Sequence, residues 1–114
     1  MERSILLIFL TIPGVFADSL QPKDKDKIIS EGQSVTLSCT YDTSSSYVYL
    51  YWYKHNIKGE PKFVLCKGAR SRSDRQYIPN RQFDSITSQT STDLIIKSVT
   101  LSDSALYYCA LLVE

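Results

Sequence analysis

Histidine and cysteine are scarce in this sequence of 114 residues, which contains one histidine and three cysteines. No Cys-x-x-Cys motif occurs, so a zinc site built from His and Cys lacks its ligands. The one histidine, His55, has no evident Ser or Asp partner, and no pair of carboxylates falls in a predicted cleft. We therefore expect no metal, no other cofactor and no enzymatic activity.

An excess of charge of one sign is also lacking. Thirteen Lys and Arg residues are balanced by 12 Asp and Glu residues, which leaves a net charge of +1 at pH 7. Such a chain has no broad positive field to hold nucleic acid or an anionic membrane. With four Gly, four Pro and 43% hydrophobic residues, the composition is that of an ordinary globular chain. The length suits one compact domain. The balanced charge indicates that this domain does not bind nucleic acid.

Only one long hydrophobic run occurs, and it lies near the N-terminus. Residues 5–12 are almost all apolar, Pro13-Gly14 ends the run, and Val15-Phe16-Ala17 suits a signal peptidase. The run is far shorter than the roughly 20 residues of a membrane-spanning helix. A buried N-terminal helix is the alternative, but the Pro-Gly pair would end it early. We predict a signal peptide over residues 1–17, entry into the secretory pathway, and one domain over residues 18–114.

Downstream of this run, the patterns predict short strands and no domain-forming helix. Val35, Leu37 and Cys39 alternate with polar residues, which is typical of a strand with one buried face. Further runs that alternate, or that are rich in β-branched and aromatic residues, cover residues 47–54, 63–66, 83–86, 92–97 and 105–110. Several short strands separated by turn residues favour an all-β fold, an antiparallel β-sandwich of two sheets.

The predicted secretory pathway bears on the three cysteines, because its oxidising environment favours disulfides over thiols. Their odd number leaves at least one cysteine unpaired within the chain. Cys39 lies on an early predicted strand and Cys109 on a late one, whereas Cys66 lies between them. A bridge between the first and last cysteines would join the two sheets through the core. In the chain-entropy description, it would stabilise the fold by roughly 4 kcal/mol.

One combination of residues points to a family. Cys39 is followed by Trp52 and then by residues 103–109, which read Asp-Ser-Ala-Leu-Tyr-Tyr-Cys and place Tyr107 two residues before Cys109. This Cys…Trp…Cys framework with a tyrosine corner resembles immunoglobulin-superfamily variable (V) domains. The resemblance covers the whole chain after the predicted signal peptide, and it implies the V-type sandwich.

Shorter motifs refine this resemblance. Residues 39–44, 52–54 and 108–111 look most like those of a T-cell receptor alpha or delta chain variable segment. Light-chain variable segments usually carry alternating Gly and Ser where residues 85–92 contain no Gly. An antibody light-chain variable domain and an innate cell-surface immunoglobulin-like adhesion or co-receptor domain are the two alternative interpretations.

The resemblance implies roles for several buried residues. It pairs Cys39 with Cys109 in a disulfide, leaves Cys66 free, and places Trp52 and Tyr107 in the core. It also implies that Asp103 pairs with an arginine at the start of an earlier strand, for which Arg81 is the candidate. In the family an aromatic residue directly follows that arginine, whereas Gln82 follows it here.

The resemblance further implies a face that binds a partner chain, the variable domain of a T-cell receptor beta (or gamma) chain. Four residues are expected there: Tyr53, His55, Pro61 and Tyr108. Aromatic residues gathered on one sheet face are typical of an interface rather than of a solvated surface. His55 stands where the family usually has a glutamine that hydrogen-bonds across the interface, and an imidazole can also donate and accept.

Three loops are implied as the binding site for a peptide–MHC ligand. They cover residues 43–49, residues 67–73 and the segment that starts at residue 110. The expected ligand contacts are Ser45, Ser46, Tyr47, Tyr49, Lys67, Gly68, Arg70, Ala110 and Leu111. Tyrosine suits this role because it offers a large contact area at low entropic cost, and serine adapts its hydrogen bonds.

By the same resemblance, the chain is an unrearranged segment that lacks the final strand of the V domain. Its last strand is then expected to have no neighbour on one side. A joining segment, a constant domain and a membrane helix would follow Glu114 in the assembled receptor, and signalling subunits would contact only those regions. The assembled receptor would display the domain on the extracellular side of the plasma membrane.

Overall fold

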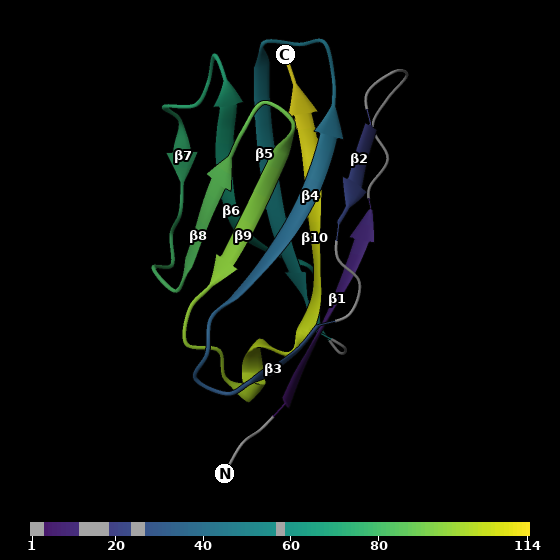
Figure 1. Ribbon diagram of the computed structural model, residues 1–114. Helices are drawn as coiled ribbons and strands as arrows, with labels where there is room; N and C mark the ends of the chain where they lie inside the picture. Colours follow the sequence, from purple (N-terminus) through teal and green to yellow (C-terminus); the bar gives the residue numbers. More distant parts are fainter. Residues whose placement is uncertain (1–3, 12–18, 24–26, 57–58) are drawn as a thin grey trace.

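The computed structural model describes residues 4–11, 19–23, 27–56 and 59–114. In this part of the chain, ten strands form two sheets that pack face to face (Figure 1). The strands are β1 (Ser4–Thr11), β2 (Ser19–Pro22), β3 (Lys27–Ser30), β4 (Val35–Asp42), β5 (Tyr47–His55), β6 (Lys62–Arg70), β7 (Gln76–Tyr77), β8 (Phe83–Thr87), β9 (Ser91–Ile96) and β10 (Ala105–Val113). A short 3₁₀ helix, η1 (Leu101–Asp103), precedes β10.

The larger sheet has the strand order β3-β1-β10-β5-β6-β7, and the smaller sheet has the order β2-β4-β9-β8. All neighbouring strands are antiparallel except β1 and β10, which are parallel. The predicted all-β sandwich of two sheets is therefore confirmed. None of the helices in the described residues is long and apolar enough to cross a membrane.

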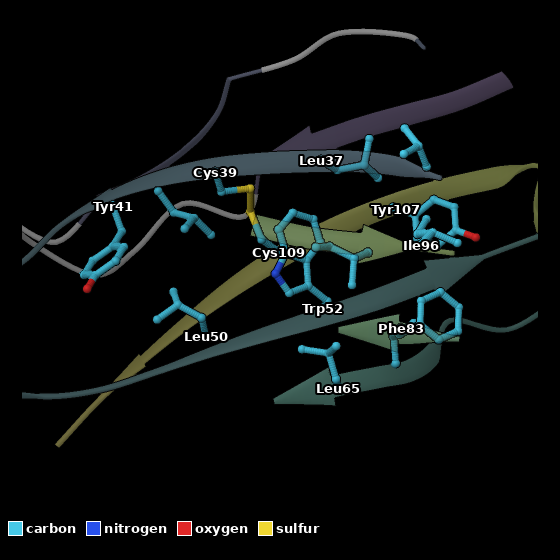
Figure 2. Packing of buried hydrophobic residues seen from close by; sticks show 14 of the residues in the cluster. Leu37, Cys39, Tyr41, Leu50, Trp52, Leu65, Phe83, Ile96, Tyr107 and Cys109 are labelled. Atoms are coloured by element: carbon cyan, nitrogen blue, oxygen red, sulfur yellow. A yellow bond between two sulfur atoms is a disulfide. The ribbon is translucent and has the colours of Figure 1, made fainter. Parts of the chain in front are cut away.

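The core lies between the sheets because the strands alternate buried and accessible residues. Along β4, Val35, Leu37, Cys39 and Tyr41 are buried while the residues between them are more accessible. Side chains from β5, β9 and β10 meet them from the other strands, and Trp52, Ile96 and Tyr107 are fully buried (Figure 2). The alternation of the sequence thus places one apolar face of each sheet against the other.

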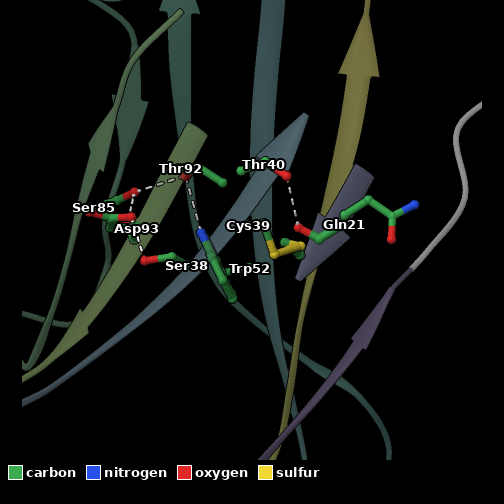
Figure 3. Close-up of a disulfide and its surroundings, with 9 residues drawn as sticks. Gln21, Ser38, Cys39, Thr40, Trp52, Ser85, Thr92 and Asp93 are labelled. Atoms are coloured by element: carbon green, nitrogen blue, oxygen red, sulfur yellow. Dashed lines mark hydrogen bonds between the residues drawn. A yellow bond between two sulfur atoms is a disulfide. The ribbon is translucent and has the colours of Figure 1, made fainter. Parts of the chain in front are cut away.

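A disulfide joins the sheets at the centre of this core. It links Cys39 of β4 to Cys109 of β10 and leaves Cys66 free, as predicted. The Trp52 side chain packs beside the disulfide, and its Nε1 donates to Thr92 Oγ1 at 3.3 Å (Figure 3). The indole therefore fills the core without leaving its N–H unsatisfied.

The corner before β10 differs from the expected arginine pair. The Tyr107 hydroxyl donates to the backbone oxygen of Asp103 at 2.8 Å, which fixes the corner. Gln82 Nε2 donates to Asp103 Oδ2 at 2.9 Å, and Lys54 Nζ lies 3.9 Å from Oδ1. Arg81 is exposed and is not the partner of this carboxylate. The amide of the following residue takes that place, so the expected pair with Arg81 is wrong.

Strand β6 continues past its predicted end at residue 66. It runs to Arg70, and Lys67 and Gly68 pair with β5 instead of lying in a loop. The register between β5 and β6 shifts after Trp52, and this irregularity turns the consecutive residues Val64 and Leu65 inward. The segment that leaves the sheet is therefore shorter than expected and covers residues 71–75.

Strand β10 has a neighbour on both sides, contrary to the expectation of an unpaired last strand. Leu7 to Thr11 of β1 pair with Ala105 to Cys109, and the other edge of β1 pairs with β3. A run rich in Ile, Leu and Phe has high strand propensity, and it satisfies backbone groups at the edge of β10. The predicted signal peptide thus includes β1, while its proposed cleavage site at residues 15–17 lies outside the described residues.

Candidate functional site

Four segments that are distant in the sequence lie together at one end of the sandwich (Figure 1). They are residues 43–47, residues 71–75, the turn of residues 88–90 between β8 and β9, and residues 110–114. We call these four segments the loop surface. Backbone hydrogen bonds connect three of them: Ser71 N–H donates to the Ser46 oxygen, and Glu114 N–H donates to the Tyr47 oxygen, both at 3.0 Å. The turn is joined through the Arg70 side chain, which donates to the Gln89 backbone oxygen. The loop surface is therefore one continuous unit.

The first segment has its own internal hydrogen bonds. Thr43 is buried, and its hydroxyl oxygen accepts from Ser45 N–H at 3.2 Å. The Ser45 hydroxyl oxygen accepts from Tyr47 N–H at 3.1 Å, and the same hydroxyl donates to the Glu114 backbone oxygen at 2.9 Å. These turns raise Ser46 and Tyr47 to the surface, where the Tyr47 side chain is 45% exposed. An aromatic ring is thus presented outward on a hydrogen-bonded base.

Two arginines reach toward the first segment, one just before the second segment and one within it. Arg70 lies at the end of β6, and its guanidinium donates to backbone oxygens of Thr43 and Ser45. The Arg72 guanidinium lies over the Tyr47 ring, 4.8 Å from its centroid, and its Nε is 3.6 Å from Glu114 Oε1. Arg72 is not among the residues that the sequence analysis expected to contact a ligand. Residues 71–74 form a turn, where no alternation indicates which side chains face the first loop, so the sequence held no signal for Arg72.

The residues predicted to contact a ligand occupy different environments. Ser46 and Tyr47 are exposed, and five others are partly exposed: Ser45, Tyr49, Arg70, Ala110 and Leu111. Lys67 instead turns toward the smaller sheet, where its Nζ donates to the Ser85 backbone oxygen at 2.8 Å. Gly68 is buried beneath the second segment. The structure thus brings the first-loop residues to the surface and places Lys67 and Gly68 below it.

The outward side of the larger sheet carries a cluster of aromatic rings. We call Tyr51, Tyr53, Phe63, Tyr77 and Tyr108 the aromatic face. Tyr53 stacks on Tyr108 with 5.4 Å between ring centroids, and Phe63 stacks on Tyr77 at 5.7 Å. The Tyr53 and Phe63 rings meet edge to face at 6.2 Å. Rings from β5, β6, β7 and β10 therefore form one continuous surface.

Two of the four predicted partner-chain residues, Tyr53 and Tyr108, belong to this face. His55 is partly exposed two residues along the same strand, and Pro61 is exposed just before β6. Sequence reasoning did not select Tyr51 or Phe63, although Tyr51 is two residues from Tyr53 on the same strand. Alternation along a strand places residues at that spacing on the same side. The same rule does not predict the position of Tyr77, because its strand has only two residues and shows no alternation.

Cys66 lies in the middle of the aromatic face. Its Cα pairs with Tyr51 on one side and Tyr77 on the other, and it is partly exposed. Burial raises the pKa of this thiol, and a hydrogen bond with the Tyr51 side chain opposes that rise in part. The thiol therefore stays protonated at neutral pH and acts as a small apolar group. No three His, Cys, Asp or Glu side chains in the described ranges are grouped to hold a metal ion.

Comparisons with known proteins match most of the chain. The family model of the immunoglobulin V-set domain matches residues 23–114. Human T cell receptor alpha variable 18 is 38% identical over 107 residues, which cover 94% of this chain and 90% of that protein. Human T cell receptor alpha variable 14/delta variable 4 is 33% identical, covering 87% of this chain and 84% of that protein. The rabbit T-cell receptor alpha chain V region RL-5 is 32% identical, covering 95% and 78%.

Proposed function

Because this chain belongs to the immunoglobulin V-set family, among its T-cell receptor alpha and delta variable segments, we propose that its loop surface recognises a peptide–MHC complex. The family consists of binding domains without enzymatic activity, and this chain is the antigen-recognition variable domain of a T-cell receptor. The three relatives named above favour this function over an antibody light-chain domain and over an adhesion or co-receptor domain.

The observation that supports ligand recognition most directly is the hydrogen-bonded union of separate loops. Residues 43–47 and 71–75 share the Ser71 to Ser46 hydrogen bond, and residue 114 closes on Tyr47. Recognition by several loops needs them held at fixed relative positions, because ordering loops on binding lowers affinity. We propose Ser45, Ser46, Tyr47 and Tyr49 as first-loop contacts, together with Ala110 and Leu111 at the start of the third loop. Lys67, Gly68 and Arg70 belong to the second-loop region of the same proposed site.

Pairing with a second variable domain is implied by the family, and we propose the aromatic face as its location. Stacked aromatic rings that are half exposed in the free domain are typical of residues that become the buried centre of a protein interface. The proposed partner is the variable domain of a T-cell receptor beta (or gamma) chain, with His55 and Pro61 at the margin of the contact. Tyr53 and Tyr108 supply the central stacked pair.

We further propose a route to the cell surface. Variable domains of this family are extracellular parts of membrane receptors. A signal peptide over residues 1–17 would direct this chain into the secretory pathway, and its removal would uncover the edge of β10 that β1 occupies. A joining segment would then complete the sheet, and the constant and membrane regions would contact the signalling subunits.

The change Tyr47→Ala tests ligand recognition. In the assembled receptor, we expect it to weaken binding to a cognate peptide–MHC complex by about 1 to 2 kcal/mol, because it removes exposed aromatic contact area. The melting temperature should stay nearly constant because the ring lies outside the core. Surface plasmon resonance and thermal unfolding measure the two effects.

Leu101→Ala is the matched control, since it removes an exposed large side chain from η1. The helix η1 lies at the opposite end of the domain (Figure 1). It should leave binding unchanged. If Tyr47→Ala leaves affinity intact across several receptors that use this segment, or if it unfolds the domain, the loop surface is scaffold and the proposed function is wrong.

A further inference from the structure

One side chain, that of Arg70 at the end of β6, joins two segments of the loop surface. Its Nη1 donates to the backbone oxygens of Thr43 at 2.6 Å and Ser45 at 2.7 Å. Its Nε and Nη2 both donate to the Gln89 backbone oxygen, at 3.1 Å and 2.6 Å. Thr43 and Ser45 lie in the first loop, and Gln89 lies in the turn between β8 and β9. The guanidinium therefore bridges backbone groups that the sheets themselves do not connect.

The position of Arg70 in the chain directs its side chain into this bridge. Its backbone φ is +56°, in the left-handed region that residues other than glycine seldom adopt. Such a conformation persists where surrounding contacts hold it in place. The guanidinium also lies over the Tyr41 ring, 5.2 Å from its centroid, and the Tyr41 hydroxyl donates to Ser88 in the same turn. Backbone, hydrogen bonds and ring contact thus fix one orientation.

These bonds leave little of Arg70 for a ligand. A guanidinium has five N–H donors in a planar fork, and all three of its nitrogens already donate to backbone oxygens here. Uncharged carbonyl oxygens satisfy the hydrogen bonds of the cation without neutralising it. The side chain is therefore arranged to order the protein's own loops.

We propose that Arg70 is a positioning residue, which holds the first loop and the β8–β9 turn in their binding conformation before the ligand arrives. This inference rests on the proposed function, and it replaces ligand contact as the role of Arg70. Loops ordered in advance lose less conformational entropy on binding. If only a fraction of receptors held the binding conformation, the apparent Kd would rise by the inverse of that fraction.

The first test needs no ligand. In the assembled heterodimer, amide hydrogen exchange is measured for the wild type, Arg70→Ala, Arg70→Lys and the control Arg75→Ala. The Ser71 amide is the reporter, because it donates to Ser46 of the first loop. We expect several-fold faster exchange at Ser71 and Tyr47 in Arg70→Ala. Arg75→Ala should leave exchange unchanged, because it removes an exposed arginine whose side chain forms an ion pair with its neighbour Asp74.

Arg70→Lys separates geometry from charge. Lysine keeps the positive charge but lacks the planar fork that spans three carbonyl oxygens, so exchange should remain faster than in the wild type. It also serves as the second variant if Arg70→Ala fails to assemble. Wild-type exchange rates in both Arg70 variants would overturn the proposal.

The second test uses a soluble peptide–MHC complex found by screening the assembled receptor against a peptide library. Loosened loops should slow association several-fold and change dissociation little, whereas loss of a direct contact mainly speeds dissociation. Faster dissociation with unchanged association would therefore overturn the proposal. Unchanged binding by the Arg70 variants would also overturn it. In that case Tyr47→Ala shows which proposal is wrong. If Tyr47→Ala weakens binding, only the role of Arg70 is wrong, and if binding is unchanged, the proposed function is wrong as well.

Discussion

At the scale of single residues, the two largest fully buried side chains keep their polar atoms satisfied. The Trp52 indole N–H reaches Thr92, and the Tyr107 hydroxyl reaches the Asp103 backbone oxygen. Burial raises the pKa of Tyr107, and the nearby Asp103 charge raises it further. Since a carbonyl oxygen only accepts, the phenol must stay protonated to keep this hydrogen bond.

Tyr107 therefore predicts a loss of stability at high pH. A phenol whose pKa is higher in the folded state than its usual value of about 10 makes the folded protein bind more protons than the unfolded one above that pH. The free energy of unfolding should then fall as the pH rises above about 10. In Tyr107→Phe this alkaline fall should be smaller, and the stability at neutral pH should drop by about 1 kcal/mol for the lost hydrogen bond. Urea unfolding at pH 7 and at pH 10.5 measures both effects, since stability is already expected to be falling at pH 10.5. An equal loss of stability at pH 10.5 in the wild type and Tyr107→Phe would exclude Tyr107 as the source of that loss.

At the scale of elements, most strands were predictable because the sequence alternates. β4, β5, β8, β9 and β10 lie close to the ranges that alternation and aromatic content indicated. The end of β6 was missed because Lys67 and Arg70 look solvent-facing in a sequence. In the structure each of them donates hydrogen bonds to a backbone oxygen of another segment, at Ser85 and Gln89 respectively. Such long-range partners leave no local pattern.

The same limit applies to the candidate sites. The Tyr53 and Tyr108 pair could be predicted from the family framework. The contact of Phe63 with Tyr53 could not, because it depends on the register shift between β5 and β6. Likewise, Gln82 and not Arg81 hydrogen-bonds to Asp103, because Gln82 is the residue that turns inward at the start of β8. Register and side-chain direction at irregular positions are set by packing of the whole sandwich.

Gly68 shows how an element fixes a loop. Its N–H donates to the Arg75 oxygen at 2.8 Å, and a Cβ at this position would lie 2.0 Å from the Arg72 backbone oxygen. Gly68→Ala should therefore displace residues 71–75 and destabilise the domain by roughly 1 to 3 kcal/mol. Gly59→Ala is the matched control, because the nearest atom to its new Cβ is 3.8 Å away. Equal melting temperatures for the two variants would show that the second loop does not depend on this close approach.

At the scale of the whole molecule, the sandwich separates two surfaces. The disulfide and the core hold the sheets together, the loop surface occupies one end, and the aromatic face covers the outer side of the larger sheet. The smaller sheet carries no comparable group of stacked rings among the described residues. This asymmetry predicts that a partner domain binds one sheet and leaves the other free.

Heterodimer assembly with a T-cell receptor beta chain tests this prediction most directly. Tyr108→Lys places a charge in the stacked pair with Tyr53, and it should weaken pairing by roughly 2 kcal/mol or more, as hot-spot changes do. Ile86→Lys makes the same kind of change at an exposed apolar residue of the smaller sheet, and it should leave pairing unchanged. The yield of heterodimer from co-refolding, with each variant's fold checked by circular dichroism, compares the two. We predict a large loss for Tyr108→Lys alone, and an unchanged yield for that variant, or an equal loss for both, would contradict pairing through the aromatic face.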